Sequence, residues 1–298
     1  MIKEILDKKN ITTINFLLNN LFNIKFEDDE KIPLCTQLSL DRENLIKVKK
    51  YNYKYYVRDN VNYKRGILFF FKDRNSQNKV VIIDENFKFY NLNVIALDEY
   101  YNGTVLEILY NNENIILVDS YCINCINTMR YKFIERRLEL DTFIHNLITN
   151  ENIKINIIEI NNWEKIHNLN FNEEIIIVPE ELPIKFGLNY SYFVWKNNKN
   201  INFSLNVREN NENLDLYTTN FKQFKLFATI NNKSDDILNI KNLVNYTNNC
   251  IVEFNIDEEK LTPQRVLVDK QYPSNIRIIE RSILNKNENI KLDEIFSI

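Results

Sequence analysis

The sequence predicts an α+β fold built mainly of antiparallel strands, and three observations support this. Short runs rich in β-branched and aromatic residues recur along the chain, separated by clusters of Asn, Asp and Gly, as in strands and hairpins. Residues 131–148 instead space their apolar side chains at helical intervals. Strand-like runs return after Trp163, and the apolar alternation of residues 214–256 predicts a small antiparallel barrel.

Taken in order, residues 2–21 are predicted to be helical. Strands are expected next at 67–72, 80–84, 87–92, 104–110 and 115–121. The segment 131–148 follows as an amphipathic helix, with charged residues between its apolar positions. Further strands are expected at 174–178, 191–195 and 201–207, and a final helix at 275–284. The layout predicts a large α+β domain over residues 1–207 and a smaller β-barrel domain with a C-terminal helix over 208–298.

Composition limits the function classes. A chain of 298 residues is long enough to bury a full core. Its net charge of −3 argues against an extended nucleic-acid coat, which would be strongly basic, but is compatible with a local basic cleft. The apolar cluster 14–18 is too short to cross a bilayer, so no membrane association is predicted.

The four cysteines do not suggest a metal site. Cys122 and Cys125 form a lone C-x-x-C inside an apolar run, and the chain has only two histidines. A structural zinc site needs four ligands with recognisable spacing. We therefore expect a buried-strand role for this pair, no structural metal, and a reducing compartment such as the nucleus or cytosol.

The most informative stretch is residues 55–69, YYVRDNVNYKRGILF, with IPLCTQLSLDRENL upstream at 32–45 and VVIID downstream at 80–84. It resembles the eukaryotic mRNA capping guanylyltransferases, in which a proline-containing segment leads to a strand ending in K-x-D-G-x-R. In that family the lysine is the nucleophile that takes GMP from GTP. Without a gap, Asn60 falls on the lysine, Asn62 on the aspartate and Tyr63 on the glycine, and Arg65 keeps the arginine.

A second motif lies near the C-terminus. Residues 262–275 read TPQRVLVDKQYPSN and resemble the family's R-x-x-x-D-K followed by P-N, with Arg265, Asp269 and Lys270 on the charged positions. The preceding IVEF at 251–254 resembles the family's I-V-E-C strand. The resemblance implies that Arg265 and Lys270 lie on the barrel and close over the β,γ-phosphates, a charge clamp carried by a moving domain.

The remaining motifs are partly preserved. Lys196 matches one of the two lysines that meet the α-phosphate, and Glu173 falls on the acid of the family's D-G-L-I-F-x-P strand, with Glu174 on its glycine. Asp119 keeps the acid of the x-L-x-F-D strand. The family's other α-phosphate lysine, its guanine-stacking ring and an active-site glutamate are replaced by Val194, Val118 and Thr104.

The resemblance covers about residues 30 to 285. It implies a nucleotidyltransferase with ATP-grasp-like antiparallel sheets and helices, followed by an OB-fold barrel. The implied reaction joins GTP and 5′-diphosphate RNA into GpppRNA, impaired here because Asn60 replaces the nucleophile. The implied ligands are GTP with Mg²⁺ or Mn²⁺, and no residue is predicted as a metal ligand. The implied nucleotide-binding residues are Arg65, Asp119, Glu173, Lys196, Arg265, Asp269 and Lys270.

The resemblance further implies a nuclear protein whose partners are the RNA 5′ end, an RNA triphosphatase and the phosphorylated C-terminal tail of RNA polymerase II. Two alternatives stay open. The chain is a non-catalytic scaffold or regulatory subunit of the capping and transcription machinery, or it is an active enzyme using a displaced lysine such as Lys64. In a continuous strand Lys64 lies on the same side as Asn60 but about 13 Å further along, at ~3.3 Å per residue.

Overall fold

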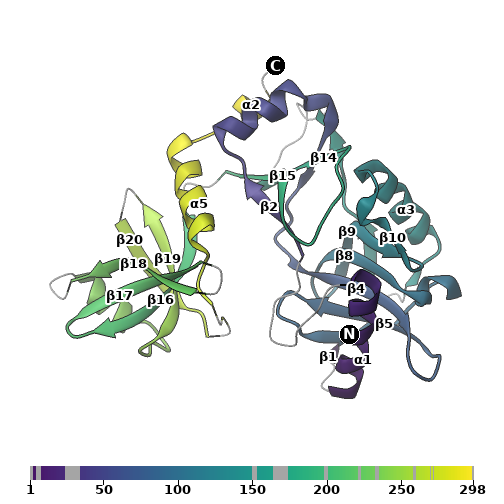
Figure 1. Cartoon of the computed structure of the whole chain (residues 1–298), viewed down its shortest axis with the longest axis horizontal. Coiled ribbons are helices and arrows are strands. Elements are labelled where there is room, and N and C mark those ends of the chain that lie inside the picture. Colours follow the sequence, from purple (N-terminus) through teal and green to yellow (C-terminus); the bar gives the residue numbers. More distant parts are fainter. Residues whose placement is uncertain are drawn as a thin grey trace. The chain divides into compact units, whose positions relative to one another are not determined.

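The computed structural model describes residues 3–4, 8–23, 34–149, 153–163, 174–197, 201–220, 223–231, 235–257, 260–268, 270 and 272–296. The chain divides into two compact units (Figure 1). The first unit comprises residues 1–38 and 50–195, and the second comprises residues 39–49 and 196–298. Both units combine strands with helices, so the predicted α+β class is confirmed.

The first unit is organised around an eight-stranded sheet. Its strands are antiparallel except that the last one, β12, pairs in parallel with β9. Five of them cover the strands predicted between residues 67 and 121. The spatial order of all eight strands is β1 (Lys3–Glu4), β6 (Phe89–Asn91), β5 (Asn78–Asp84), β4 (Lys64–Lys72), β8 (Thr104–Tyr110), β9 (Asn114–Ile123) and β10 (Ile126–Asn127), with β12 (Lys154–Ile157) beside β9.

This sheet is buried on both faces, which is why β4 reads as a continuous apolar run. On one face Ile67 and Phe69 belong to a core that includes side chains of α1 (Lys8–Phe22) and of the second sheet. On the other face Leu68 and Phe70 pack with Phe143 of α3 (Phe133–His145). Gly66 lies in β4 where an added Cβ would meet the Ile83 carbonyl oxygen at 2.5 Å, so glycine is required by the close approach of β5.

The second sheet of this unit has five strands and carries the predicted nucleophile position. Its order is β13 (Asn161–Asn162), β3 (Tyr55–Asp59), β14 (Glu174–Pro179), β15 (Gly187–Lys196) and β2 (Cys35–Ser39). A separate two-stranded sheet pairs β7 (Val94–Ile95) with β11 (Ile148–Thr149). Asn60 directly follows β3, so the edge of this sheet positions the candidate site.

The predicted helices are present with shifted ends. The segment expected at 131–148 forms α3, which begins after Lys132 because the Glu135 carboxylate accepts a hydrogen bond from the Lys132 backbone N–H at 2.9 Å. The N-terminal helix expected at 2–21 is α1, preceded by the short strand β1. Helix α2 (Arg42–Lys50) was not predicted; the Asp41 carboxylate accepts from the Asn44 backbone N–H at 2.7 Å at its start. The described part of the unit also contains the short 3₁₀ helices η1 (Asn52–Lys54), η2 (Asp98–Asn102) and η3 (Thr128–Arg130).

The second unit has the strand order of an OB-fold. Three strands form a meander, a helix follows, and the fourth strand returns beside the first, which gives the spatial order β18-β17-β16-β19-β20. All the pairings are antiparallel. The elements are β16 (Ile201–Asn210), β17 (Asn213–Asn220), β18 (Gln223–Ile230), α4 (Asp235–Lys241), β19 (Cys250–Asp257) and β20 (Lys260–Val266).

Two details of the second unit differ from the expectation. The five strands form an open sheet with β18 and β20 at its edges, rather than a closed barrel. The predicted division at 207/208 falls inside β16; the units divide after Trp195 because β16 pairs with β17 and β19. The final helix is α5 (Ile276–Glu288), capped by the Asn275 side chain, which accepts from the Arg277 N–H at 2.9 Å, and α6 (Leu292–Phe296) follows.

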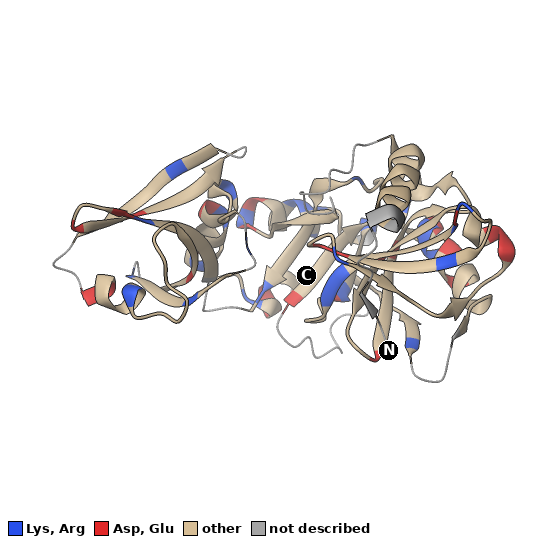
Figure 2. Cartoon of the chain, turned by 90° about the horizontal axis from the view of Figure 1, so that it is seen from below, with Lys and Arg blue, Asp and Glu red and all other residues tan. Residues whose placement is uncertain are grey.

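Charged residues of both signs are interspersed over both units in the view of Figure 2. This matches the small net charge of −3. Among the described helices, none has the length and apolar character needed to cross a membrane.

Candidate functional site

Asn60 is held by the neighbouring strand β14. Its backbone N–H donates to the Glu174 carbonyl oxygen at 3.1 Å, and its side-chain Nδ2 donates to the Glu174 carboxylate at 2.5 Å. Glu174 is the residue that falls on a glycine of the resembled family. The two positions that the resemblance singles out therefore meet in space, with the Asn60 amide bonded to the Glu174 carboxylate.

The turn that follows Asn60 packs two side chains on the protein interior. Residues 60–63 connect β3 to β4, and the Tyr63 N–H donates to the Val61 carbonyl at 2.8 Å. Val61 and Tyr63 pack against a small buried cluster of Leu109, Val118 and Ile158. Tyr63 thus packs against the cluster that contains Val118.

Beside this turn is a cavity of about 350 Å³. Asp59 lines it from the end of β3, Val61 and Tyr63 line it from the turn, and Glu159 lines it from the segment after β12. Burial raises the pKa of the Asp59 carboxyl, and the charge of Glu159 raises it further. Among the described residues that line it there are two carboxylates and no Lys or Arg, a lining that does not suit a triphosphate.

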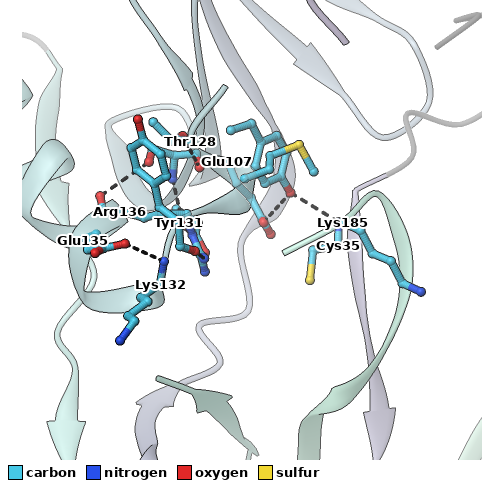
Figure 3. Close-up of polar contacts among 12 residues, drawn as sticks. Cys35, Glu107, Thr128, Tyr131, Lys132, Glu135, Arg136 and Lys185 are labelled. Atoms are coloured by element: carbon cyan, nitrogen blue, oxygen red, sulfur yellow. Dashed lines mark hydrogen bonds and ion pairs between the residues drawn. The ribbon is translucent and has the colours of Figure 1, made fainter. Parts of the chain in front are cut away.

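Arg65 is committed to an internal ion pair. Its Nη2 donates to the Cys35 carbonyl at 2.7 Å and forms an ion pair with Glu107 on β8. The Tyr121 hydroxyl donates to the other Glu107 oxygen at 2.5 Å and accepts from the Cys35 N–H at 3.2 Å (Figure 3). Burial lowers the pKa of the Arg65 guanidinium, but the charge of Glu107, its hydrogen bond to Arg65 and the nearby Tyr121 and Cys35 together outweigh burial, so the pKa is raised.

Asp119 is likewise engaged. Arg136 of α3 binds its carboxylate in a bidentate manner, with Nε–Oδ1 at 2.7 Å and Nη2–Oδ2 at 3.0 Å. The same guanidinium donates to the Tyr131 carbonyl at 2.6 Å and to the Tyr192 hydroxyl at 3.0 Å. Arg136 is fully buried, and Figure 3 shows it beside Tyr131 at the start of α3.

A third buried arginine, Arg58, lies near the Arg65–Glu107 and Arg136–Asp119 pairs. Arg58 on β3 is 5% exposed, and its Nη1 donates to the Asp59 carbonyl at 3.4 Å. Burial lowers the pKa of Arg58, opposed by the charge of Glu107. The five groups named for this interior, Arg58, Arg65, Arg136, Glu107 and Asp119, carry three positive and two negative charges, a net of +1.

The structure brings Arg65 and Asp119 into this one network, because Glu107 lies directly opposite Asp119 in the β8–β9 register. Glu107 and Arg136 were not predicted as site residues. The sequence carried a signal for both. Glu107 is a carboxylate inside the apolar run TVLEILY, and Arg136 is an arginine on the core side of a predicted helix. A charged side chain in either place needs a partner when it is buried. Which partner each finds depends on strand register and cannot be read from spacing.

Lys64 lies in a different place from that expected for a continuous strand. β3 ends at Asp59 and β4 begins at Lys64, so a turn separates Asn60 from Lys64 and strand alternation does not carry across it. Within β4, Lys64 and Arg65 point to opposite faces. Arg65 faces Glu107 and Cys35, whereas Lys64 is exposed on the other face.

The other predicted residues lie as follows. Lys196 is exposed at the end of β15. In the second unit, the exposed side chain of Arg265 pairs with Glu253 at 2.8 Å, and the Lys270 Nζ donates to the Ser204 Oγ at 2.7 Å. Glu173 and Asp269 lie outside the described residues.

The cysteines show no metal arrangement in the part of the chain that the structure describes, which holds no cluster of three or more His, Cys, Asp or Glu suited to a metal ion. Cys122 is buried in β9, as expected, but Cys125 is exposed in the turn before β10 rather than buried in a strand. The reason is the positive φ of 62° at Cys125, where the chain reverses.

These positions predict selective thiol chemistry. Burial raises the pKa of the Cys122 thiol to about 12 and raises that of Cys35 as well, so both are protonated and shielded at pH 8. In the native protein a thiol reagent should modify Cys125 rapidly, and should reach Cys35 and Cys122 only after denaturation. Mass spectrometry of the modified peptides measures this, and Cys125→Ser should leave the half-buried Cys250 as the fastest-reacting thiol of the native protein. Rapid modification of Cys35 in the native protein would contradict the burial.

No protein-family model matches the chain, and no curated protein matches its sequence. Among solved structures, the chain has low-scoring similarities to DNA ligases. The ligase domain of LigD from M. tuberculosis is 9% identical, with 83% of this chain and 98% of that chain covered and a TM-score of 0.34. Mycobacterial DNA ligase D complexed with ATP and MES is 10% identical, with 83% and 98% covered and a TM-score of 0.35. A structure of the Lig E DNA ligases is 10% identical, with 81% and 100% covered and a TM-score of 0.34.

Proposed function

We propose that this chain is a nucleotidyltransferase-fold protein related to the mRNA capping guanylyltransferases in which covalent guanylyl transfer has been lost. The observation that carries the proposal is the bond between Asn60 and Glu174 at the position of the nucleophile. A nucleophilic lysine forms a covalent bond to the nucleotide phosphorus through a deprotonated amine. A carboxamide offers no such amine, so the reaction would lose its intermediate rather than a part of its rate.

The surrounding groups support the same conclusion. Arg65 and Asp119, expected to face a nucleotide, are instead paired with Glu107 and Arg136. Binding a triphosphate there would require these buried pairs to be broken, and removing one partner of a buried pair is strongly unfavourable. In this arrangement Arg65 and Asp119 serve each other's neighbours, Glu107 and Arg136, rather than a nucleotide.

The function that remains is a non-catalytic one. We infer a scaffold or regulatory subunit of the capping and transcription machinery, acting in the nucleus. Its proposed partners are the RNA 5′ end, an RNA triphosphatase and the phosphorylated tail of RNA polymerase II. The RNA end and the phosphorylated tail each present multiple phosphates, which lysines and arginines can bind. GTP with Mg²⁺ or Mn²⁺ is a proposed ligand in a non-covalent sense only.

The test is covalent labelling. Purified chain incubated with α-labelled GTP and Mg²⁺ or Mn²⁺ is expected to show no protein–GMP adduct after denaturing electrophoresis. Asn60→Lys alone should not restore labelling, because Glu174, Asn62 and Tyr63 still occupy the site and such groups act as a unit. Asn60→Ala serves as the matched control, since it removes the amide without supplying an amine.

One result would overturn the proposal: strong labelling of the unmodified chain. If that label disappears in Lys64→Ala, Lys64 is the nucleophile and the turn at 60–63 rearranges. Retention of the unmodified chain on a phosphorylated polymerase-tail peptide, compared with the unphosphorylated peptide, tests the scaffold role separately.

A further inference from the structure

The cavity beside the turn at 60–63 has a lining that favours a positively charged ligand. Its volume of about 350 Å³ falls within the range of small-molecule sites. Among the described residues that line it, Asp59 and Glu159 are charged, and both are negative. Val61 and Ile116 contribute apolar walls, Tyr63 contributes an aromatic ring, and asparagine side chains contribute amide oxygens. The lining therefore combines two anions with neutral acceptors and an apolar surface.

The two carboxylates lie near each other. Strand β13 pairs antiparallel with β3, with Asn161 opposite Val57. Glu159 precedes Asn161 by two residues and Asp59 follows Val57 by two residues, so the continued register brings these carboxylates opposite each other. Burial and then the charge of Glu159 raise the pKa of Asp59, which agrees with this placement. Like charges at opposite positions of paired strands are destabilising, and a cation between them removes the penalty.

Neither carboxylate forms an ion pair or a hydrogen bond with another described residue. The basic residues of the adjoining elements are placed elsewhere. Arg58, the preceding residue of β3, is buried in the interior, and Arg137 pairs with Asp141 at 3.6 Å. Lys64 and Ile116 lie on opposite faces of the large sheet, so Lys64 points away from the cavity wall. The charge of the cavity is thus not balanced within the part of the chain that the structure describes.

We propose that this cavity binds an alkyl diamine, a short carbon chain with a protonated amine at each end. One ammonium meets Asp59 and the other meets Glu159, while the methylenes cover the apolar wall. An ammonium has three donors, and the asparagine oxygens accept those that the carboxylates do not use. The Tyr63 ring adds an attraction between a cation and an aromatic face.

Two other kinds of cation fit this lining less well. A calcium ion takes six to eight oxygen ligands, which the valine and isoleucine side chains of the wall do not supply. A lysine side chain of a partner protein brings one charge, whereas the cavity presents two carboxylates. The diamine matches both charges and the apolar surface.

The inference involves the first unit alone and does not rest on the loss of guanylyl transfer. Isothermal titration calorimetry of the full chain with 1,4-diaminobutane tests it. The expected Kd is roughly 10 µM to 1 mM, weaker than the limit for a ligand of so few atoms. The monoamine 1-aminobutane should bind about 3- to 20-fold more weakly, since it contacts only one of two partly exposed carboxylates.

Two substitutions test the carboxylates. Asp59→Asn and Glu159→Gln should each raise the Kd of the diamine about 3- to 20-fold and should reduce its preference over the monoamine. Glu99→Gln is the matched control, because it removes an exposed carboxylate of η2 that does not line the cavity, and it should leave both Kd values unchanged. Thermal unfolding without ligand checks the fold; neither cavity variant should lose stability, since each removes one of two repelling charges.

The proposal is overturned if the unmodified chain fails to bind the diamine at about 10 mM, ten times the weakest Kd expected for such a ligand. It is also overturned if both cavity variants bind the diamine as the unmodified chain does. Tighter binding of N-acetyl-lysine methylamide than of the diamine would replace it with a site for a protein side chain. Ca²⁺ that displaces the diamine, binds more tightly and is lost in Asp59→Asn would replace it with a metal site.

Discussion

Asp119→Ala is expected to lower the free energy of unfolding by about 3–5 kcal/mol, because it leaves the charge of Arg136 buried without its carboxylate. Arg136 is 0% exposed and cannot reach water without moving α3. Its remaining acceptors, the Tyr131 carbonyl and the Tyr192 hydroxyl, are neutral. Urea-induced unfolding of the full chain, followed by circular dichroism, measures the change.

A double variant tests whether the missing pair is the cause. Asp119→Leu combined with Arg136→Met removes both charges and keeps apolar volume, and such replacements of a buried pair are often neutral. The double variant should therefore recover most of the stability that Asp119→Ala loses. Lys47→Met, which removes an exposed cation paired with Glu43, is the control and should leave the unfolding midpoint unchanged. Equal losses in the single and double variants would show that packing, not charge, is responsible.

Phe70→Ala is expected to cost about 3–5 kcal/mol of unfolding free energy, since it removes a buried aromatic side chain and leaves a cavity. Phe70 is 0% exposed and lies at the centre of an aromatic cluster, with its ring centroid 5.2 Å from that of Phe143 and 5.7 Å from that of Tyr101. The loss should loosen the packing of α3 on the large sheet. Urea unfolding measures the cost, and limited proteolysis within 133–145 measures the loosening.

Phe16→Ala is the matched control for this substitution. Phe16 lies on α1 and is 62% exposed, so its replacement removes the same side chain from a site where little apolar surface is buried. It should change the unfolding midpoint far less than Phe70→Ala. A similar loss in both variants would contradict the two-faced core on which β4 depends.

The local elements were largely determined by the sequence alone. The helix at Phe133–His145 and the strands β4, β5, β8 and β9 were predicted, because apolar periodicity and β-branched content act over a few residues. Helix α2 was missed: its apolar face consists of little more than Leu45 and Val48. Asp41, whose carboxylate accepts from the Asn44 N–H at the start of α2, was a helix-capping signal that the search for apolar periodicity did not use.

The sequence predicted where in the chain the candidate site lies, but not the contacts that its residues make. The sequence placed Asn60 where a nucleophile would stand, since the neighbouring motif residues are close along the chain. It could not show that Glu174 bonds Asn60, because these residues are 114 positions apart. The register of β3 against β14 decides that contact, and a shift of one residue would turn Glu174 to the other face.

The same physical reason explains the rest of the site. Glu107, Tyr121 and Arg136 lie on three different elements, and each carries a polar group that cannot remain buried without a partner. The sequence therefore required partners for them. Only the tertiary structure decided that Glu107 takes Arg65 and that Asp119 takes Arg136, since sheet order and helix docking determine which buried charges come within bonding distance.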